Sequence, residues 1–187
     1  MRECNHSIAG PFMTSTTEHS TIPDVLDSLL GIAPGSPLHA VRHARDKVAL
    51  ATQDSQDLFF DPALAHNLSL NERLWVAYYA TLLSAQPTLS GYYLSQLQAA
   101  GAEANVLADV DASQIDLLED QRLAAILRFT RILIESPVHG DQSALQALQH
   151  QGLSTAEIVV LAQLIAFLSY QVRLAAGLGA LKSAGAA

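Results

Sequence analysis

Apolar residues recur at helical spacing along most of the chain, and no run of alternating β-branched residues is long enough for a strand. This pattern, with its glycine and proline punctuation, predicts helices over residues 23–31, 36–60, 69–86, 87–101, 117–135, 141–150 and 157–181. We expect the second helix to break near Asp54 and to end at Pro62. The sequence therefore predicts an all-α fold.

Two of the predicted helices begin with the same signal. Leu-Ser-x-x-Glu occurs at residues 68–72 and again at 153–157. In such a capping box the Ser hydroxyl and the Glu carboxylate each accept a hydrogen bond from a backbone N–H that the helix leaves free. The two copies indicate either an internal structural repeat or a chance match between two capped, apolar helices.

Length and composition bound the domain organisation and the partners. The 187 residues suit one domain, and we expect a flexible tail rich in Ser, Thr and His over residues 1–21 and a single helical domain over 22–187. A net charge of −8 disfavours nucleic acid and anionic membranes, because both reward clustered Lys and Arg. The longest apolar run, 158–170, is shorter than the roughly 20 residues of a membrane span. We therefore expect no membrane segment and, by default, a cytoplasmic protein.

The charged residues are few for a monomer, at 15% of the chain. One explanation is a homo-oligomer in which the apolar helix at 157–181 forms the subunit interface. The other is that Gln, Ser and Thr supply the polar surface.

Segments spread over residues 21–181 carry a resemblance to a known family. The central ones read Leu-Ser-Leu-Asn-Glu-Arg at 68–73 and Gln-Pro-Thr-Leu at 86–89, with an apolar helix between them. Others lie at residues 24–27, 31–36, 121–125, 129–131, 152–154, 165–167 and 173–174. Together they resemble the alkylhydroperoxidase D (AhpD) / carboxymuconolactone decarboxylase family, and its peroxidase-related branch in particular. The resemblance implies an AhpD-like helical bundle that assembles into dimers, trimers or hexamers.

The family's peroxidase members use a Cys-x-x-Cys pair at a helix start, followed by a His, with a Glu as proton relay. A thiolate at a helix N-terminus attacks the peroxide, and the second thiol resolves the sulfenic acid. In this chain the cysteine positions hold Gln86 and Leu89. The His position holds Tyr93 and the relay position holds Leu74, while the one cysteine, Cys4, lies in the predicted tail. The resemblance therefore implies the scaffold without thiol peroxidase activity.

The altered redox position predicts a candidate ligand pocket. Tyr78, Gln86 and Tyr93 bring hydroxyl and amide groups among apolar neighbours, which suits a small, mostly apolar ligand. Glu72 and Arg173 are further candidates, although Glu72 also caps a helix and Arg173, inside an apolar helix, requires an anion partner. The alternative is that the tyrosines only pack in the core.

Two histidines raise the question of a metal. His39 and His43 are four residues apart on a predicted helix, a spacing that can place two imidazoles on one ion. No third ligand is evident nearby, so we interpret both as exposed helix residues and predict no metal. The sequence has no Gly-rich phosphate loop, and we expect no cofactor.

Three classes of function follow. The first is a non-thiol family member that binds a small ligand or serves as the partner of an intact, cysteine-bearing relative. The second is a cofactor-free enzyme of altered chemistry, such as proton transfer or decarboxylation, in a cavity lined by Tyr and Gln. The third is a purely structural oligomer.

Overall fold

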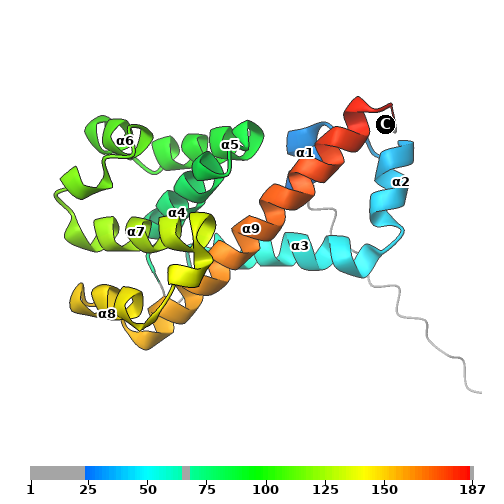
Figure 1. Ribbon diagram of the computed structural model, residues 1–187. Helices are drawn as coiled ribbons and strands as arrows, with labels where there is room; N and C mark the ends of the chain where they lie inside the picture. Colours follow the sequence, from blue (N-terminus) through cyan, green and yellow to red (C-terminus); the bar gives the residue numbers. More distant parts are fainter. Residues whose placement is uncertain (1–23, 65–67, 186–187) are drawn as a thin grey trace, which may run out of the picture.

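The computed structural model describes residues 24–64 and 68–185, and every regular element among them is a helix (Figure 1). The all-α prediction is confirmed; the predicted tail over residues 1–21 lies outside the described residues. The N-terminal helices are α1 (Val25–Leu30), α2 (Pro37–His43) and α3 (Asp46–Phe59). The central ones are α4 (Leu70–Leu83), α5 (Pro87–Ala99), α6 (Ala104–Asp111), the 3₁₀ turn η1 (Ile115–Leu117) and α7 (Gln121–Glu135). The 3₁₀ turn η2 (Pro137–His139), α8 (Gln142–His150) and α9 (Thr155–Ser183) are the last of the described elements.

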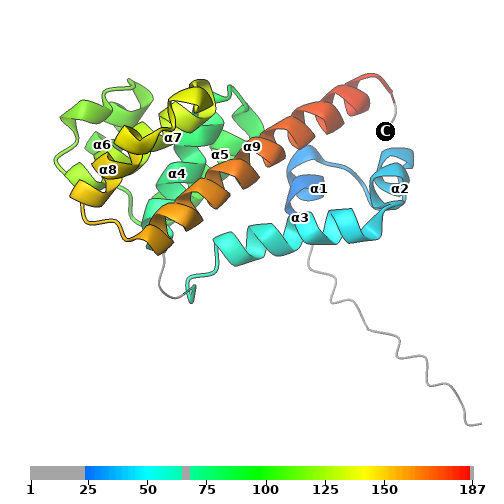
Figure 2. The same cartoon turned by 60° about the horizontal axis from the view of Figure 1, so that its bottom comes forward.

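Helix α9 connects the two ends of the molecule. Helices α4 to α8 gather at one end, α1 and α2 lie at the other, and α9 runs between them (Figures 1 and 2). Its contacts with α4, α7 and α8 are followed, further along, by contacts with α1. The main core is built where α4, α5, α7 and α9 meet, around the fully buried Val76, Leu89, Leu127 and Leu161.

Helix α9 is also the one described helix that is long and apolar enough, at 29 residues, to cross a membrane by length and composition. A core helix passes the same test, and α9 carries the buried Gln171 among its apolar residues. The expectation of a protein without a membrane segment stays a prediction.

Both predicted capping boxes are present, and one arginine joins them. Ser69 and Glu72 cap α4, and Ser154 and Glu157 cap α9 with the same reciprocal hydrogen bonds. Arg122, in the first turn of α7, contacts Glu72 Oε1 at 2.7 Å and Glu157 Oε1 at 2.6 Å. The two Leu-Ser-x-x-Glu segments thus lie close together in space, with equivalent roles.

The second predicted helix does break, but the predicted position of the break near Asp54 is wrong. The chain turns at Ala44 and Arg45, and Asp54 lies inside α3. After this turn, Arg42 and His43 of α2 pair with the carboxylates of Asp24 and Asp27 at the start of α1. Helical periodicity does not report such long-range pairs, so the position of the break could not be predicted from it.

The helix predicted over 117–135 begins later than expected. Asp120 caps α7 by accepting from the backbone N–H groups of Arg122 and Leu123, and Leu117 belongs to η1. Helix α6 was not predicted. Its N-cap Glu103 makes no capping hydrogen bond, so the usual start signal is missing.

Candidate functional site

The positions that the resemblance assigns to redox cysteines lie where α5 begins. Gln86 is the half-buried residue before the helix, and its side chain makes no capping hydrogen bond. Leu89 is fully buried three residues later. An amide and an alkyl side chain form neither a thiolate nor a disulfide. Cys4 lies outside the described residues.

Tyr93 lies in the core with two glutamines. Its hydroxyl is 2.9 Å from Gln56 Oε1 and 2.8 Å from Gln171 Oε1, and Gln171 Nε2 donates to Gln56 Oε1 at 2.9 Å. All three side chains are buried, and burial raises the pKa of Tyr93 far above its ordinary value. The hydroxyl therefore stays protonated and joins α3, α5 and α9 by hydrogen bonds. The sequence analysis missed both glutamine partners, because they come from distant helices.

The remaining residues near the positions that the resemblance assigns to the redox site have other partners. Leu74 is buried in the core. The Tyr78 hydroxyl donates to Asp111 Oδ1 at 2.5 Å, and burial, together with this hydrogen bond and the charge of Asp111, raises the pKa of Tyr78. Glu72 is occupied by its helix cap and by Arg122.

Arg173 is exposed and donates to the Ser169 carbonyl oxygen at 2.7 Å. Its charge is solvated and needs no anion partner, so that part of the sequence interpretation is wrong. Tyr78, Tyr93, Glu72 and Arg173 thus bind different partners rather than one another.

A cavity of about 680 Å³ lies elsewhere, between α1, α2 and α3. Its apolar wall contains Ile32, Ala33, Pro34, Ala49 and Leu50. Its polar groups are Asp24, Asp27, Ser28, His39, His43 and Gln53. The cavity therefore combines apolar surface with a concentrated set of titratable side chains.

Local signals fix the α1 wall of this cavity. The Asp24 carboxylate caps α1 by accepting from the backbone N–H of Asp27 at 3.0 Å. The helix ends at Gly31, as predicted, with a left-handed φ of +60°. Lys182, near the end of α9, donates to the carbonyl oxygens of Leu30 and Gly31 at 2.7 and 3.0 Å. A cation at these free carbonyls stabilises the helix end.

Arg42 fixes the carboxylates that face α2. Its guanidinium lies 2.9 Å from Asp24 Oδ2 and 2.8 Å from Asp27 Oδ1, and its side chain is only 5% exposed. The contact with Asp27 Oδ1 is an ion pair without hydrogen-bond geometry, and this buried oxygen accepts no hydrogen bond from the described residues. Arg42 therefore holds one oxygen of Asp27, lies 3.2 Å from His43 Nε2, and leaves Asp27 Oδ2 to face His43.

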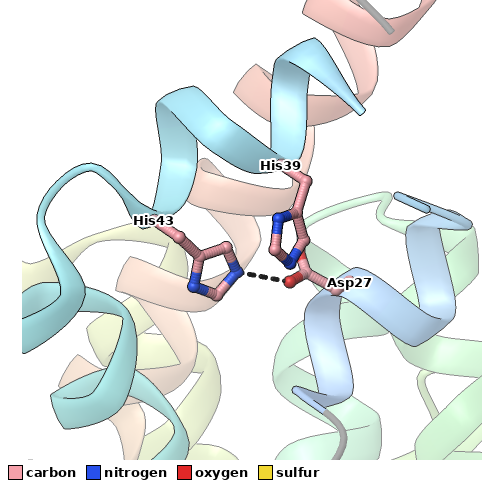
Figure 3. A group of neighbouring side chains, drawn as sticks. All are labelled: Asp27, His39 and His43. Carbon is pink, nitrogen blue, oxygen red and sulfur yellow. Dashed lines mark hydrogen bonds and ion pairs between the residues drawn. The ribbon is translucent and has the colours of Figure 1, made fainter. Parts of the chain in front are cut away.

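Asp27, His39 and His43 point toward one another, as Figure 3 shows. His43 Nε2 lies 2.6 Å from Asp27 Oδ2. The two imidazole rings stack with their centroids 4.2 Å apart. One potential ligand atom from each of the three residues lies within 4.8 Å of the other two. This is the group among the described residues that could hold a metal ion.

The histidine pair was predicted from its spacing, but its surroundings were not. The interpretation of both residues as exposed is wrong, because each is half-buried where α2 packs against α1. The missing third ligand is Asp27, which precedes the pair by 12 residues. The sequence offered only a weak signal, the two acidic residues Asp24 and Asp27 three positions apart at the start of the first predicted helix.

Comparison with protein-family models and with curated proteins gives no match for this chain.

Proposed function

We propose that the protein is an AhpD-like helical scaffold without the redox cysteines, and that it binds a small, mostly apolar molecule with one polar end. The order and spacing of the segments at residues 21–181 support the scaffold. The cavity between α1, α2 and α3 is the observation that carries the binding function.

The size and lining of the cavity suit such a ligand. Small-molecule sites in proteins are mostly apolar hollows of about 300–1,000 Å³ with a few placed polar groups, and this cavity measures about 680 Å³. Its apolar wall can take an apolar body out of water. Asp27, His39 and His43 stand together on the polar wall, where they can fix the orientation of a polar end group.

Binding of the neutral apolar dye Nile red to the full chain tests this function. We expect saturable binding, followed by dye fluorescence, and weakening by about tenfold or more, equal to about 1.4 kcal/mol, in Ala33→Phe. Ala33 is an exposed part of the cavity wall, so the added ring fills the cavity without entering the core.

Ala147→Phe is the matched control, because Ala147 is exposed on α8 and away from the cavity. This variant should bind the dye like the wild type. Equal binding by wild type and Ala33→Phe, or no saturable binding by either protein, would overturn the proposed function.

The missing thiols make a separate prediction. Purified protein should not reduce an organic hydroperoxide with a dithiol as reductant, because Gln86 and Leu89 provide neither a thiolate nor a resolving thiol. Hydroperoxide consumption is the measurement. Robust, dithiol-dependent turnover would contradict the scaffold's assignment as redox-inactive.

A further inference from the structure

We propose that Asp27, His39 and His43 form a binding site for one divalent first-row transition-metal ion. Imidazole nitrogen and carboxylate oxygen are ligands of Zn²⁺, Fe²⁺, Co²⁺ and Ni²⁺, and two histidines with one carboxylate are a common three-ligand set. The inference goes beyond the proposed function, because an ion can occupy this site whether or not an organic molecule fills the cavity.

The backbone arrangement brings the three ligands to one place. His39 and His43 follow each other by one helical turn on α2, so both rings leave the same face of the helix. Asp27 comes from α1, which α2 faces (Figure 3). Arg42, between the histidines in sequence, ties α2 to α1 through Asp24 and Asp27.

The short contact between His43 and Asp27 brings two potential ligand atoms together. His43 Nε2 lies 2.6 Å from Asp27 Oδ2. Metal–ligand distances of about 2.0–2.2 Å set ligand atoms roughly 3.3 Å apart in a tetrahedral site, and these three atoms already lie within 4.8 Å of one another.

The charges around the site favour a cation. Asp24 and Asp27 contribute −2 and Arg42 contributes +1, so the fixed charges of these three side chains sum to −1. Arg42 contacts Oδ1 of Asp27 and lies 3.2 Å from His43 Nε2, while Oδ2 of Asp27 faces His43. Such an outer contact orients a ligating carboxylate toward the metal.

The site also opens onto the cavity, since all three residues are part of its lining. Three protein ligands leave at least one coordination position free, the arrangement of metal sites that bind an exogenous molecule. The ion would give the cavity an electrophilic centre at its polar wall. The matching ligand class is a molecule with an apolar body and an oxygen or nitrogen donor at one end.

Titration of the full chain, stripped with a chelator, with Co²⁺ tests the site. We expect one saturable site with the visible absorption of cobalt bound to nitrogen and oxygen, displaced by Zn²⁺. Affinity should fall by about tenfold or more in His39→Gln and in His43→Gln. His150→Gln, at an exposed histidine on α8, is the matched control and should bind like the wild type.

The variants separate ligand loss from unfolding. The His39 ring makes no hydrogen bond with the described residues, and Gln in place of His43 can still donate to Asp27, so both variants should keep the wild-type far-ultraviolet circular dichroism. His6, His19 and His66 lie outside the described residues. They are unchanged in the wild type and in each variant, so any cobalt that they bind contributes equally to every titration.

Wild-type cobalt affinity in both His39→Gln and His43→Gln, or no saturable binding by the wild type, would overturn the metal site. Nile red binding by the metal-free protein is measured in the same samples. If the protein binds Nile red but not cobalt, the metal site is wrong and the proposed function stands. If it binds cobalt but not Nile red, the proposed apolar-ligand function is wrong and the metal site stands.

Discussion

Single residues near the start of α5 hold positions that are unusual for their type. Ala85 has a φ of +49°, and its N–H and that of Gln86 donate to the carbonyl oxygens of Leu82 and Thr81. This is the pattern of a Schellman helix end, in which glycine normally takes the left-handed position, as Gly101 does after α5. Tyr93, one turn beyond Leu89, places a hydroxyl in the core. Both residues lead to predictions about stability.

Ala85→Gly should stabilise the protein by up to about 1 kcal/mol. A side chain at positive φ costs roughly 1–2 kcal/mol, and the greater freedom of glycine in the unfolded chain offsets part of the gain. Thermal unfolding measures the effect. Ala100→Gly is the control, because Ala100 caps α5 at a φ of −81° and should only lose stability. A lower melting temperature in Ala85→Gly would contradict the left-handed geometry.

Tyr93→Phe should destabilise the fold by about 1–3 kcal/mol, because it leaves buried amide oxygen without its donor. Urea unfolding is the measurement. The same exchange at Tyr170 is the control, since that side chain is 42% exposed and water can replace its contact with Thr52. Equal losses in the two variants would argue against a buried network.

At the scale of helices, ion pairs join the first turns of α4, α7 and α9. Arg122 bridges the two capping glutamates, so the capping boxes are linked to each other as well as to their own helices. Burial opposes ionisation of Glu157, but its hydrogen bonds from Ser154 and Arg122 outweigh burial and lower the pKa of Glu157. Because the pKa of Glu157 is lowered, the stability that this junction contributes depends on pH in the acidic range.

Arg122→Gln should lower stability by about 1 kcal/mol at pH 7, a small value because these side chains are partly exposed. The unfolded chain holds the Glu157 proton at a higher pH than the folded protein does. The stability from this group is therefore present above the ordinary Glu pKa near 4.3 and disappears as pH falls through the lower folded pKa. The gap in melting temperature between wild type and variant should shrink from pH 7 to pH 3.

Arg128→Gln is the control for this measurement. Its partner Asp116 is 79% exposed, so removal of the pair should change stability less at either pH. A gap for Arg122→Gln that widens in acid would contradict the role given to the glutamates.

Across the whole molecule, local sequence signals predicted most of the helices but not the contacts between them. Capping boxes, Pro87 and Gly31 act within a few residues, so they can be recognised in the sequence. The break before α3 and the grouping of Asp27 with two histidines depend on how α2 packs against α1. The glutamines that hold Tyr93 come from α3 and α9, 37 and 78 residues away. Only a folded chain brings such groups together.

The contact of Lys182 with the end of α1 has a consequence for how the chain can be altered. It spans 152 residues in sequence and lies at the far end of a helix about 44 Å long. A protein cut short before Lys182 would lose the cation at two carbonyl groups beside the cavity. The last turn of α9 therefore supports the α1 wall of the cavity, and a truncation that removes Lys182 should change the region whose ligand binding is being measured.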